Sequence, residues 1–229
     1  MSKIGIICAM KPEMDILLEG LGEGKKVKML GVTFYEGNIN NHHVVLSLCG
    51  VGKVNAAVAA TLLISEFNCN LIINSGIAGG VLPLKKRDSV IATSLAYHDF
   101  DTTPFGYEFG QVPGMPKEYM VNPELLIMVK TIFNRLELPY ICTKVYSGDK
   151  FVHSMEQLSG VKNEEGYAVE MEGAAIAQVC VKAGIDFIVL RYISDIIGEE
   201  NQQESYIEFE KEMSLRSSKV TLQLLENMD

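Results

Sequence analysis

The chain has 229 residues, of which 48% are hydrophobic, so it can bury a core and is expected to fold over most of its length. Its 29 acidic and 20 basic side chains give a formal charge of -9, which argues against a protein that binds nucleic acid or an anionic membrane surface. Neither a signal peptide nor a membrane-spanning apolar stretch is visible. The five scattered cysteines form no CxxC pair, so we expect no disulfide, no metal site and a reducing cytoplasmic environment.

Short β-rich apolar runs alternate with segments of helical periodicity, which is typical of an α/β sheet covered by helices. The expected elements, in chain order, are a strand over Lys3–Cys8, a helix over Glu13–Leu21, strands over Val32–Ile39 and His42–Leu48, a helix over Lys53–Glu66, strands over Leu71–Asn74 and Asp88–Ser94, a helix over Asn122–Leu136, strands over Ile141–Ser147 and Tyr167–Glu170, a helix over Gly173–Ala183, a strand over Phe187–Ile193 and a terminal helix from about Ser205. The turn Asn40-Asn41 predicts an antiparallel hairpin, which argues against a plain doubly wound order. No repeat or linker is visible, so we predict one domain over residues 1–229.

The segment from Tyr97 to Met120 does not fit this alternation. It carries glycine, proline and aromatic residues without any period. Long irregular loops in compact domains are usually functional or lie at interfaces. We therefore expect this loop to contribute to a site or to a subunit contact.

Two glycine-rich segments resemble phosphate-binding motifs but fail on spacing. Around Gly50-Val51-Gly52-Lys53, a Walker A loop would need glycine and serine or threonine where Ser47 and Val54 stand. The run Gly76-Ile77-Ala78-Gly79-Gly80 lacks the GxGxxG spacing of a dinucleotide site and opens no helix. These segments predict only a strand end where backbone can approach a ligand closely. The pair His42-His43 is a poor metal site, because adjacent strand residues point to opposite faces.

Acidic residues stand where predicted strands end, and ligands collect at such strand ends in open α/β sheets. Glu13 follows the first strand, Glu170 and Glu172 lie at a strand-to-helix junction, and Asp195 comes four residues after Arg191 at the end of an apolar strand. An alternative interpretation of Glu13, Glu170 and Glu172 is that they are solvated acids near helix starts. An arginine and an aspartate at the end of so apolar a strand are harder to explain as surface residues.

Together with the segments around them, these residues match the motifs of a known family. The segments KIGIICAMKPEM, GVGKVNAA, INSGIAGG, YHDFDTTPFGYEFGQVPG, SGDKF, VEMEGAAIA and RYISD run nearly end to end. In this order they resemble the bacterial 5′-methylthioadenosine/S-adenosylhomocysteine nucleosidases, within the wider purine nucleoside phosphorylase family. The resemblance implies a three-layer αβα sandwich with a mixed central β-sheet, like that of nucleoside phosphorylases. It also implies a homodimer that uses water to release adenine from a 5′-thio-substituted nucleoside, without a cofactor or metal.

The resemblance also implies catalytic roles. Asp195 matches the general acid that protonates N7 of adenine, and burial would raise its pKa for that purpose. Glu172 matches the carboxylate that binds the ribose hydroxyls beneath an oxocarbenium-like sugar. Glu13 matches the base that deprotonates the attacking water, with Arg191 expected to orient it.

Further substrate contacts come from the same resemblance. Phe151 matches the ring that stacks on adenine, and the main chains of Val152 and Gly79 match backbone contacts. The remaining expected contacts are Met10, Val51, Ile77, Glu170, Met171, Ser194 and Tyr206, of which Met10, Val51 and Tyr206 match the apolar pocket around the ribose and the thioether. Phe105, Tyr107 and Pro113 match residues that a neighbouring subunit lends to the site, which would explain the irregular aromatic loop.

One position departs from the family pattern, and three alternative functions stay open. Ile77 stands where well-known members carry serine, so a hydroxyl near the ribose is lost, at a cost on the order of 1 kcal/mol or more. A phosphorylase would need a cationic phosphate pocket, and only Arg191 is near the predicted site. An aminodeoxyfutalosine-type nucleosidase would share nearly every residue named above. A non-catalytic nucleoside-binding protein is the third alternative, against which Glu13, Glu172 and Asp195 argue together.

Overall fold

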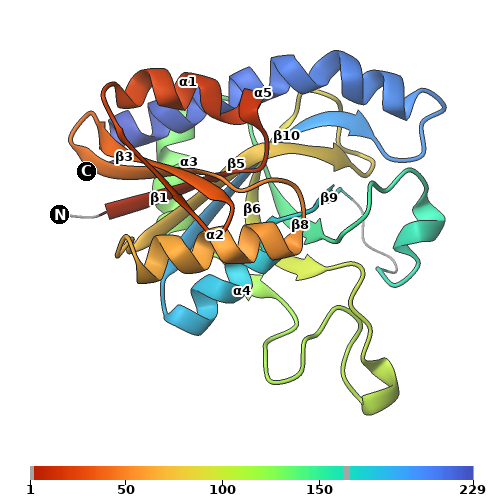
Figure 1. Ribbon diagram of the computed structural model, residues 1–229. Helices are drawn as coiled ribbons and strands as arrows, with labels where there is room; N and C mark the ends of the chain where they lie inside the picture. The colour runs from red at the N-terminus through yellow and green to blue at the C-terminus, as the bar shows by residue number, and fades with distance from the viewer. Residues whose placement is uncertain (1–2, 162–165, 229) are drawn as a thin grey trace.

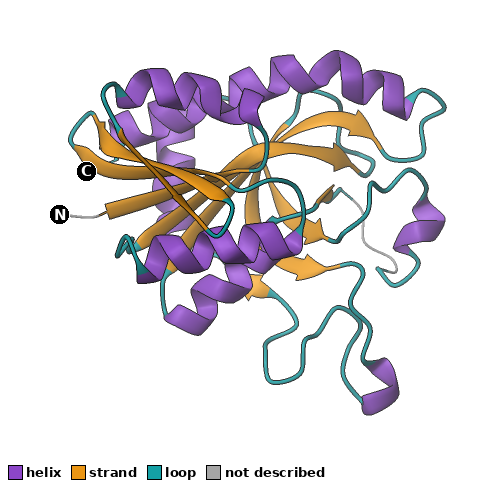
Figure 2. Cartoon of the chain, viewed as in Figure 1, coloured by secondary structure: helices purple, strands orange, loops and turns teal. Residues whose placement is uncertain are grey.

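The computed structural model describes residues 3–161 and 166–228 as a central sheet with helices on both faces (Figures 1 and 2). The strands are β1 (Lys3–Cys8), β2 (Lys25–Met29), β3 (Val32–Ile39), β4 (His42–Leu48), β5 (Leu71–Gly80), β6 (Ser89–Tyr97), β7 (Tyr119–Met120), β8 (Ile141–Ser147), β9 (Ala168–Glu170) and β10 (Asp186–Ile196). The α-helices are α1 (Lys11–Leu21), α2 (Lys53–Ser65), α3 (Pro123–Arg135), α4 (Gly173–Ala183) and α5 (Gln202–Asn227), and the short 3₁₀ helices are η1 (Thr103–Phe105) and η2 (Met155–Leu158). Within the described ranges, no helix combines the length and the apolar character needed to cross a membrane.

The sheet is mixed, as the sequence predicts. Strands β4, β1, β5 and β10 run parallel to one another, while β2, β3 and β4 form an antiparallel meander at one edge. Beyond β5 the sheet closes into a ring, because β10 pairs with β6, β6 with β8, β8 with β9, and β9 back with β5. The mixed sheet confirms the predicted fold class, and the ring is a feature that periodicity alone does not reveal.

Two apolar clusters join the three layers. One packs α2 and α4 against one face of the sheet, and the other packs α1, α3 and α5 against the opposite face. Strand β5 lies between them and is buried over nearly its whole length. Because both faces of this strand are covered, the polar groups at its end have to find partners inside the protein.

The carboxyl ends of the parallel strands place the site. Strand β10 pairs in register with β5 up to Ile193, and Ser194 is then an extra residue before Asp195 pairs with Gly79. Such a β-bulge re-aims the side chains that follow it. It lies opposite Ala78 and Gly79 near the end of β5, beyond the level at which the neighbouring strands β1 and β4 end.

The structure differs from the predicted elements mainly at ends and edges. Strand β2 was not predicted, because three of its five residues are lysines on an exposed edge. Strands β5 and β10 extend beyond their predicted ends through glycine, serine and aspartate residues that stay in the ladder. Helix α5 begins at Gln202, three residues before the predicted start.

Candidate active site

The carboxyl group of Glu13 is buried in the first turn of α1 and held by main-chain donors. Its Oε2 accepts the N–H groups of Ala9 and Met10 at 2.9 and 3.0 Å, and its Oε1 accepts the N–H of Ile77 at 3.3 Å. Gly76 permits this approach, because a Cβ there would lie 2.5 Å from Glu13 Oε1. Burial raises the pKa of Glu13 above its usual value, although the N–H of Met10 acts in the opposite direction. The group can therefore exchange a proton closer to neutral pH than an exposed glutamate.

Asp195 is the second buried carboxyl group, and it follows the bulge in β10. Its Oδ1 accepts the hydroxyl of Ser194 at 2.6 Å, and its Oδ2 accepts the side-chain amide of Gln202 at 2.7 Å. Burial raises the pKa of Asp195, while these two hydrogen bonds favour the ionised form and limit the rise. A carboxyl group in this environment is suited to donate a proton.

Glu172 is the third, at the junction between β9 and α4. Its Oε1 accepts the main-chain N–H of Gly52 at 2.7 Å. Gly52 has a φ of 103°, a conformation that other residues rarely adopt, so a glycine is needed to aim this N–H. Burial and the nearby charge of Glu170 raise the pKa of Glu172 to about 8. Such a pKa favours the protonated form of this carboxyl group near neutral pH.

Glu170 differs from these three because its partners keep it ionised. Its Oε2 lies 2.5 Å from Nη2 of Arg191, and its oxygens also accept the hydroxyl of Ser147 and the N–H groups of Glu172 and Gly173. Burial alone would raise the pKa of Glu170, but Arg191 and these donors outweigh it and lower the pKa. The role of Glu170 as a substrate contact stays a prediction, and its oxygens already have several protein partners.

The structure places Arg191 differently from the expectation that it orients Glu13. Its guanidinium is buried and donates to Glu170, to the side chain and main chain of Asn74, and to the carbonyl of Leu190. Across the described residues it makes no hydrogen bond to Glu13, and it does not line the cavity. Main-chain N–H groups already hold Glu13, so Arg191 influences it through its charge alone.

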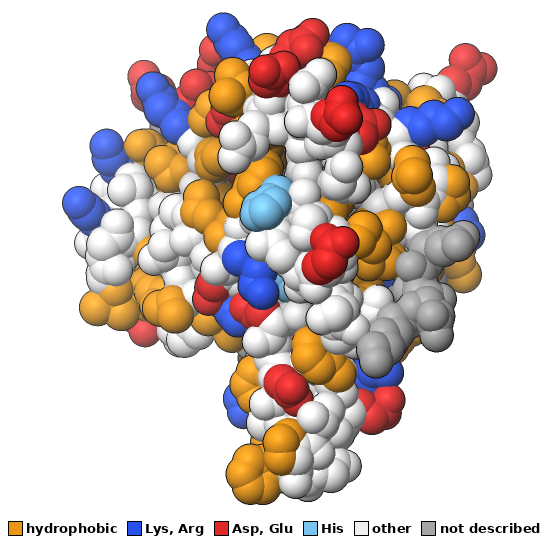
Figure 3. All heavy atoms as spheres, turned by 90° about the vertical axis from the view of Figure 1, so that its right-hand side faces the viewer, with side chains coloured by type: hydrophobic (Ala, Val, Ile, Leu, Met, Phe, Trp, Pro, Cys, Tyr) orange, Lys and Arg blue, Asp and Glu red, His pale blue; other side chains and the backbone are white. Residues whose placement is uncertain are grey.

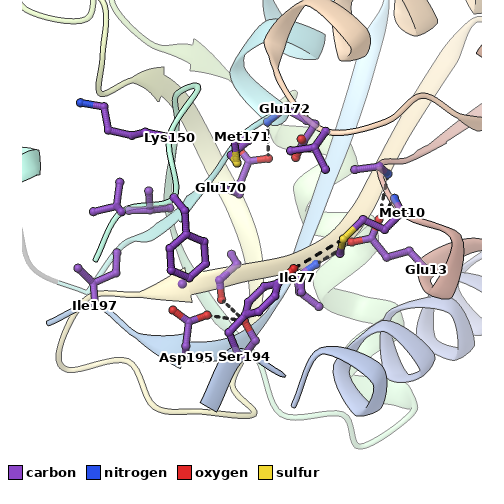
Figure 4. Close-up of a pocket in the computed structure, with 18 residues that line it drawn as sticks. Met10, Glu13, Ile77, Lys150, Glu170, Met171, Glu172, Ser194, Asp195 and Ile197 are labelled. Carbon is purple, nitrogen blue, oxygen red and sulfur yellow. Dashed lines mark hydrogen bonds between the residues drawn. The ribbon is translucent and has the colours of Figure 1, made fainter. Parts of the chain in front are cut away.

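The three carboxyl groups with raised pKa values border one cavity, whose volume of about 610 Å³ includes space that is open to solvent (Figure 4). Asp195 lies on one side of it and Glu13 on the other, with Ile77 between them. Every expected site residue outside the irregular loop, except Arg191, lines this cavity: Met10, Glu13, Val51, Ile77, Gly79, Phe151, Val152, Glu170, Met171, Glu172, Ser194, Asp195 and Tyr206. The structure therefore brings together residues that are up to 196 positions apart in the chain.

Aromatic and sulfur-bearing side chains form an apolar wall of the cavity. The rings of Phe151 and Tyr206 meet edge to face with centroids 5.4 Å apart, and the hydroxyl of Tyr206 donates to the sulfur of Met10 at 3.7 Å. Such a wall suits a flat heterocycle and a thioether. Two protonatable carboxyl groups on opposite sides of such a cavity suit the cleavage of a bond between such a ring and a sugar.

Comparisons with known proteins agree with this geometry. The family model of the phosphorylase superfamily matches residues 3–226. The 5′-methylthioadenosine/S-adenosylhomocysteine nucleosidase of Staphylococcus carnosus is 39% identical over 229 residues, which cover 98% of this chain and 100% of the relative. The chain belongs to this nucleosidase family, within the phosphorylase superfamily. It is therefore an enzyme of the nucleosidase class.

Solved structures of nucleosidases agree in fold over the whole chain. The 5′-methylthioadenosine/S-adenosylhomocysteine nucleosidase from Neisseria meningitidis, in complex with methylthio-immucillin-A, has a TM-score of 0.93 at 36% identity, with 100% of both chains covered. The futalosine hydrolase of Helicobacter pylori has a TM-score of 0.92 at 30% identity and covers 99% of this chain and 98% of its own. Both proteins share the architecture, so the fold alone does not separate their substrates.

The irregular loop of this nucleosidase lies away from its own cavity. The loop around η1 projects from the body of the molecule (Figures 1 and 3). Phe105 is 81% exposed, Tyr107 and Pro113 are also exposed, and none of the three lines the cavity. A contribution of these residues to a site stays a prediction that needs a second subunit.

Several residues of the nucleosidase site are not predicted from the sequence. The missed cavity residues are Ala9, Ala78, Lys150, Val169 and Ile197, and Gln202 lies just behind the wall. Lys150 could have been found, because it stands next to Phe151 in the SGDKF segment. The small and aliphatic residues carry no such signal, because their type fits a core position equally well.

Proposed function

We propose that the protein hydrolyses the N-glycosidic bond of 5′-methylthioadenosine and S-adenosylhomocysteine, releasing adenine and a 5′-thio-substituted ribose. The observation that carries the proposal is the cavity in which Asp195 and Glu13, both buried and with raised pKa values, lie on opposite sides of an apolar slot. The names of the relatives from Staphylococcus carnosus and Neisseria meningitidis support the substrate pair.

In the proposed reaction Asp195 donates its proton to N7 of the adenine ring as the bond between C1′ and N9 breaks. The bonding electron pair goes to the departing base, which leaves as neutral adenine, and the sugar becomes oxocarbenium-like. The Ser194 hydroxyl and the Gln202 amide then stabilise the Asp195 carboxylate that remains. This arrangement lowers the barrier because these donors are in place before the charge forms.

Water completes the reaction from the other side of the cavity. Glu13 accepts a proton from the water molecule while the water oxygen forms the new bond to C1′. The N–H groups of Ala9, Met10 and Ile77 fix the Glu13 carboxyl group, so the base needs little reorganisation. Glu172 binds the ribose hydroxyls, and binding favours its ionised form, which stabilises the positive sugar.

The remaining predicted contacts divide between the base and the 5′ substituent. Phe151 would stack on adenine while the main chains of Val152 and Gly79 contact its edge. Met10, Val51 and Tyr206 would surround the ribose and thioether. Met171, Ser194, Glu170 and Ile77 are the other predicted contacts in the wall.

We also propose that the working enzyme is a homodimer. Val51 is 48% exposed at the mouth of the cavity, and the projecting loop offers Phe105, Tyr107 and Pro113 to a neighbour. A loop that exposes large apolar side chains is typical of an interface. In this proposal the loop of each subunit covers the 5′ end of the other subunit's site.

A futalosine-type substrate is the second candidate, supported by the structural similarity to the futalosine hydrolase of Helicobacter pylori. A phosphorylase is disfavoured, because the Arg191 charge is committed to Glu170 and the cavity presents further carboxyl groups to an approaching phosphate.

The deciding experiment measures adenine release from purified protein with 5′-methylthioadenosine, first without phosphate and then with it, and identifies the sugar product. Release without phosphate, with a free reducing sugar, supports the hydrolase. Release only with phosphate would mean a phosphorylase and a wrong role for Glu13. The same assay with S-adenosylhomocysteine and aminodeoxyfutalosine separates the two candidate substrate classes, and failure with all three would favour the non-catalytic alternative.

A further inference from the structure

Gln202, the first residue of α5, joins the site from behind the cavity wall. Its side chain is buried, with a residue exposure of 4%, and it does not line the cavity. Its Nε2 donates to Asp195 Oδ2 at 2.7 Å and to the main-chain carbonyl of Val152 at 2.8 Å. Its Oε1 accepts the main-chain N–H of Gly198 at 3.1 Å. One amide therefore links the end of β10, the segment after β8 and the turn that precedes α5.

The partners of this amide fix its orientation. A side-chain amide has two N–H donors and one carbonyl oxygen, and here both donors face acceptors while the oxygen faces a donor. If the amide were flipped, its oxygen would face the Val152 carbonyl and the Asp195 carboxyl group, and its NH₂ would face the N–H of Gly198. The network therefore determines which end of Gln202 faces the acid.

The two acceptors that Gln202 joins are the two groups that contact the adenine ring in the proposed reaction. Asp195 is the proposed donor to N7, and the main chain of Val152 is the proposed contact to the adjoining edge of the ring. Since both oxygens lie within hydrogen-bond distance of a single nitrogen, their separation is at most two hydrogen-bond lengths. The distance between the Asp195 carboxyl group and the Val152 carbonyl thus depends on Gln202, a residue that does not line the cavity in which adenine would bind.

We propose that Gln202 is a positioning residue that holds the Asp195 carboxyl group and the Val152 carbonyl in the arrangement required for proton transfer to the purine. This inference rests on the proposed nucleosidase function and adds to it a residue that acts through Asp195. By donating to Oδ2, Gln202 also stabilises the carboxylate that remains after the proton has left.

Other groups around Asp195 have a smaller effect on its ionisation. Lys86, in the loop after β5, favours the carboxylate, and Glu199, in the turn after β10, opposes it. These two side chains pair with each other at 2.7 Å, so their effects partly cancel. Ser194 and Gln202 are the direct donors, and Tyr206 of α5 is a titratable group that interacts with Asp195 through its charge. A change at Gln202 should therefore be visible in the pH profile.

The test uses Gln202→Met, which keeps the length of the side chain but has no strong hydrogen-bonding group, with Gln203→Met as the matched control on the exposed neighbouring position. We expect Gln202→Met to lower kcat about tenfold or more with 5′-methylthioadenosine, because it removes a hydrogen bond to an ionised group. The basic limb of the kcat profile should move to higher pH, because the lost donor favoured the ionised form of Asp195. Gln203→Met should match the wild type in both measurements.

A second variant, Gln202→Glu, keeps the shape of the side chain but replaces the NH₂ donors with an oxygen. It should lose more activity than Gln202→Met, because its carboxylate faces Asp195 and the Val152 carbonyl. A residue that only filled space would tolerate both changes and leave the pH profile unchanged. The proposal would be overturned if either variant is folded, as judged by circular dichroism, and keeps both the wild-type kcat and the wild-type basic limb of the pH profile. If Gln202→Met does not fold, the result with Gln202→Glu decides. A wild type that releases no adenine would instead refute the proposed function.

Discussion

Removing the charge of Glu170 should destabilise the fold strongly, because Arg191 would remain buried without its ionic partner. Both side chains are almost inaccessible, with 2% of the Arg191 side chain and 3% of the Glu170 side chain exposed. Breaking a buried pair from one side costs roughly 3–5 kcal/mol. Glu170→Gln should cost an amount in this range, since its new NH₂ group would also face donors from Ser147 or from the main chain of Gly173.

The reverse change should be milder. In Arg191→Met the Glu170 carboxylate keeps the Ser147 hydroxyl and the N–H groups of Glu172 and Gly173 as partners. The double variant Glu170→Gln/Arg191→Met leaves no unpaired buried charge. We expect it to be more stable than Glu170→Gln alone, with a coupling free energy of about 1–3 kcal/mol between the two positions.

Urea unfolding followed by far-ultraviolet circular dichroism measures these differences, since the chain has no tryptophan to report by fluorescence. All variants are compared at one protein concentration, because subunit association would contribute to the apparent stability. A loss below about 1 kcal/mol for Glu170→Gln, or single costs that simply add in the double variant, would refute the reasoning. Wild-type stability in Glu170→Gln would mean that water reaches the guanidinium.

The remaining predictions concern the three carboxyl groups with raised pKa values and the departure at Ile77. Asp195→Asn should abolish adenine release without unfolding the protein, and Glu13→Gln should abolish hydrolysis with less effect on substrate binding; full activity in either variant would contradict its proposed role. Glu172→Gln should raise the free energy of unfolding at pH 8 by a few kcal/mol, measured in urea without ligand. The sign follows from linkage. With its pKa raised to about 8, Glu172 binds more protons in the folded than in the unfolded protein between about pH 4.5 and 8, so its ionisation lowers the free energy of unfolding as the pH rises through that window. Glutamine does not ionise, so the variant does not lose this stability. Equal stability of variant and wild type at pH 8 would contradict the raised pKa. Ile77→Ser should change kcat/KM with 5′-methylthioadenosine several-fold, because a hydroxyl replaces an aliphatic wall of the cavity; unchanged rate and affinity would mean that this position does not matter.

Periodicity predicted the alternation of strands and helices, and strand-end chemistry predicted the acidic residues of the cavity, because burial dictates residue type at those positions. Apolar runs such as that in β5 must lie inside, and a carboxyl group at the end of such a run, like Asp195, must find a partner there. The family motifs then brought in residues such as Phe151, whose type alone would fit a core.

Other features depend on three-dimensional pairing that single residues do not encode. The ring of strands needs β10 to pair with both β5 and β6, and no local pattern specifies a strand's second neighbour. The pairing of Arg191 with Glu170, instead of an interaction that orients Glu13, depends on which of several acids lies nearest. Gln202 was missed because a glutamine near a helix start is ordinary surface chemistry until the fold buries it.

The bulge at Ser194 makes the proposed chemistry depend on the count of residues as well as on their identity. If the ladder continued without the bulge, Ser194 would pair with Gly79 and Asp195 with Gly80, and the Asp195 side chain would turn to the opposite face of the strand. The acid would remain in the sequence and yet be lost to the site. For an engineer who recombines segments of related chains, the crossover point must therefore leave Ile193, Ser194 and Asp195 intact as one unit.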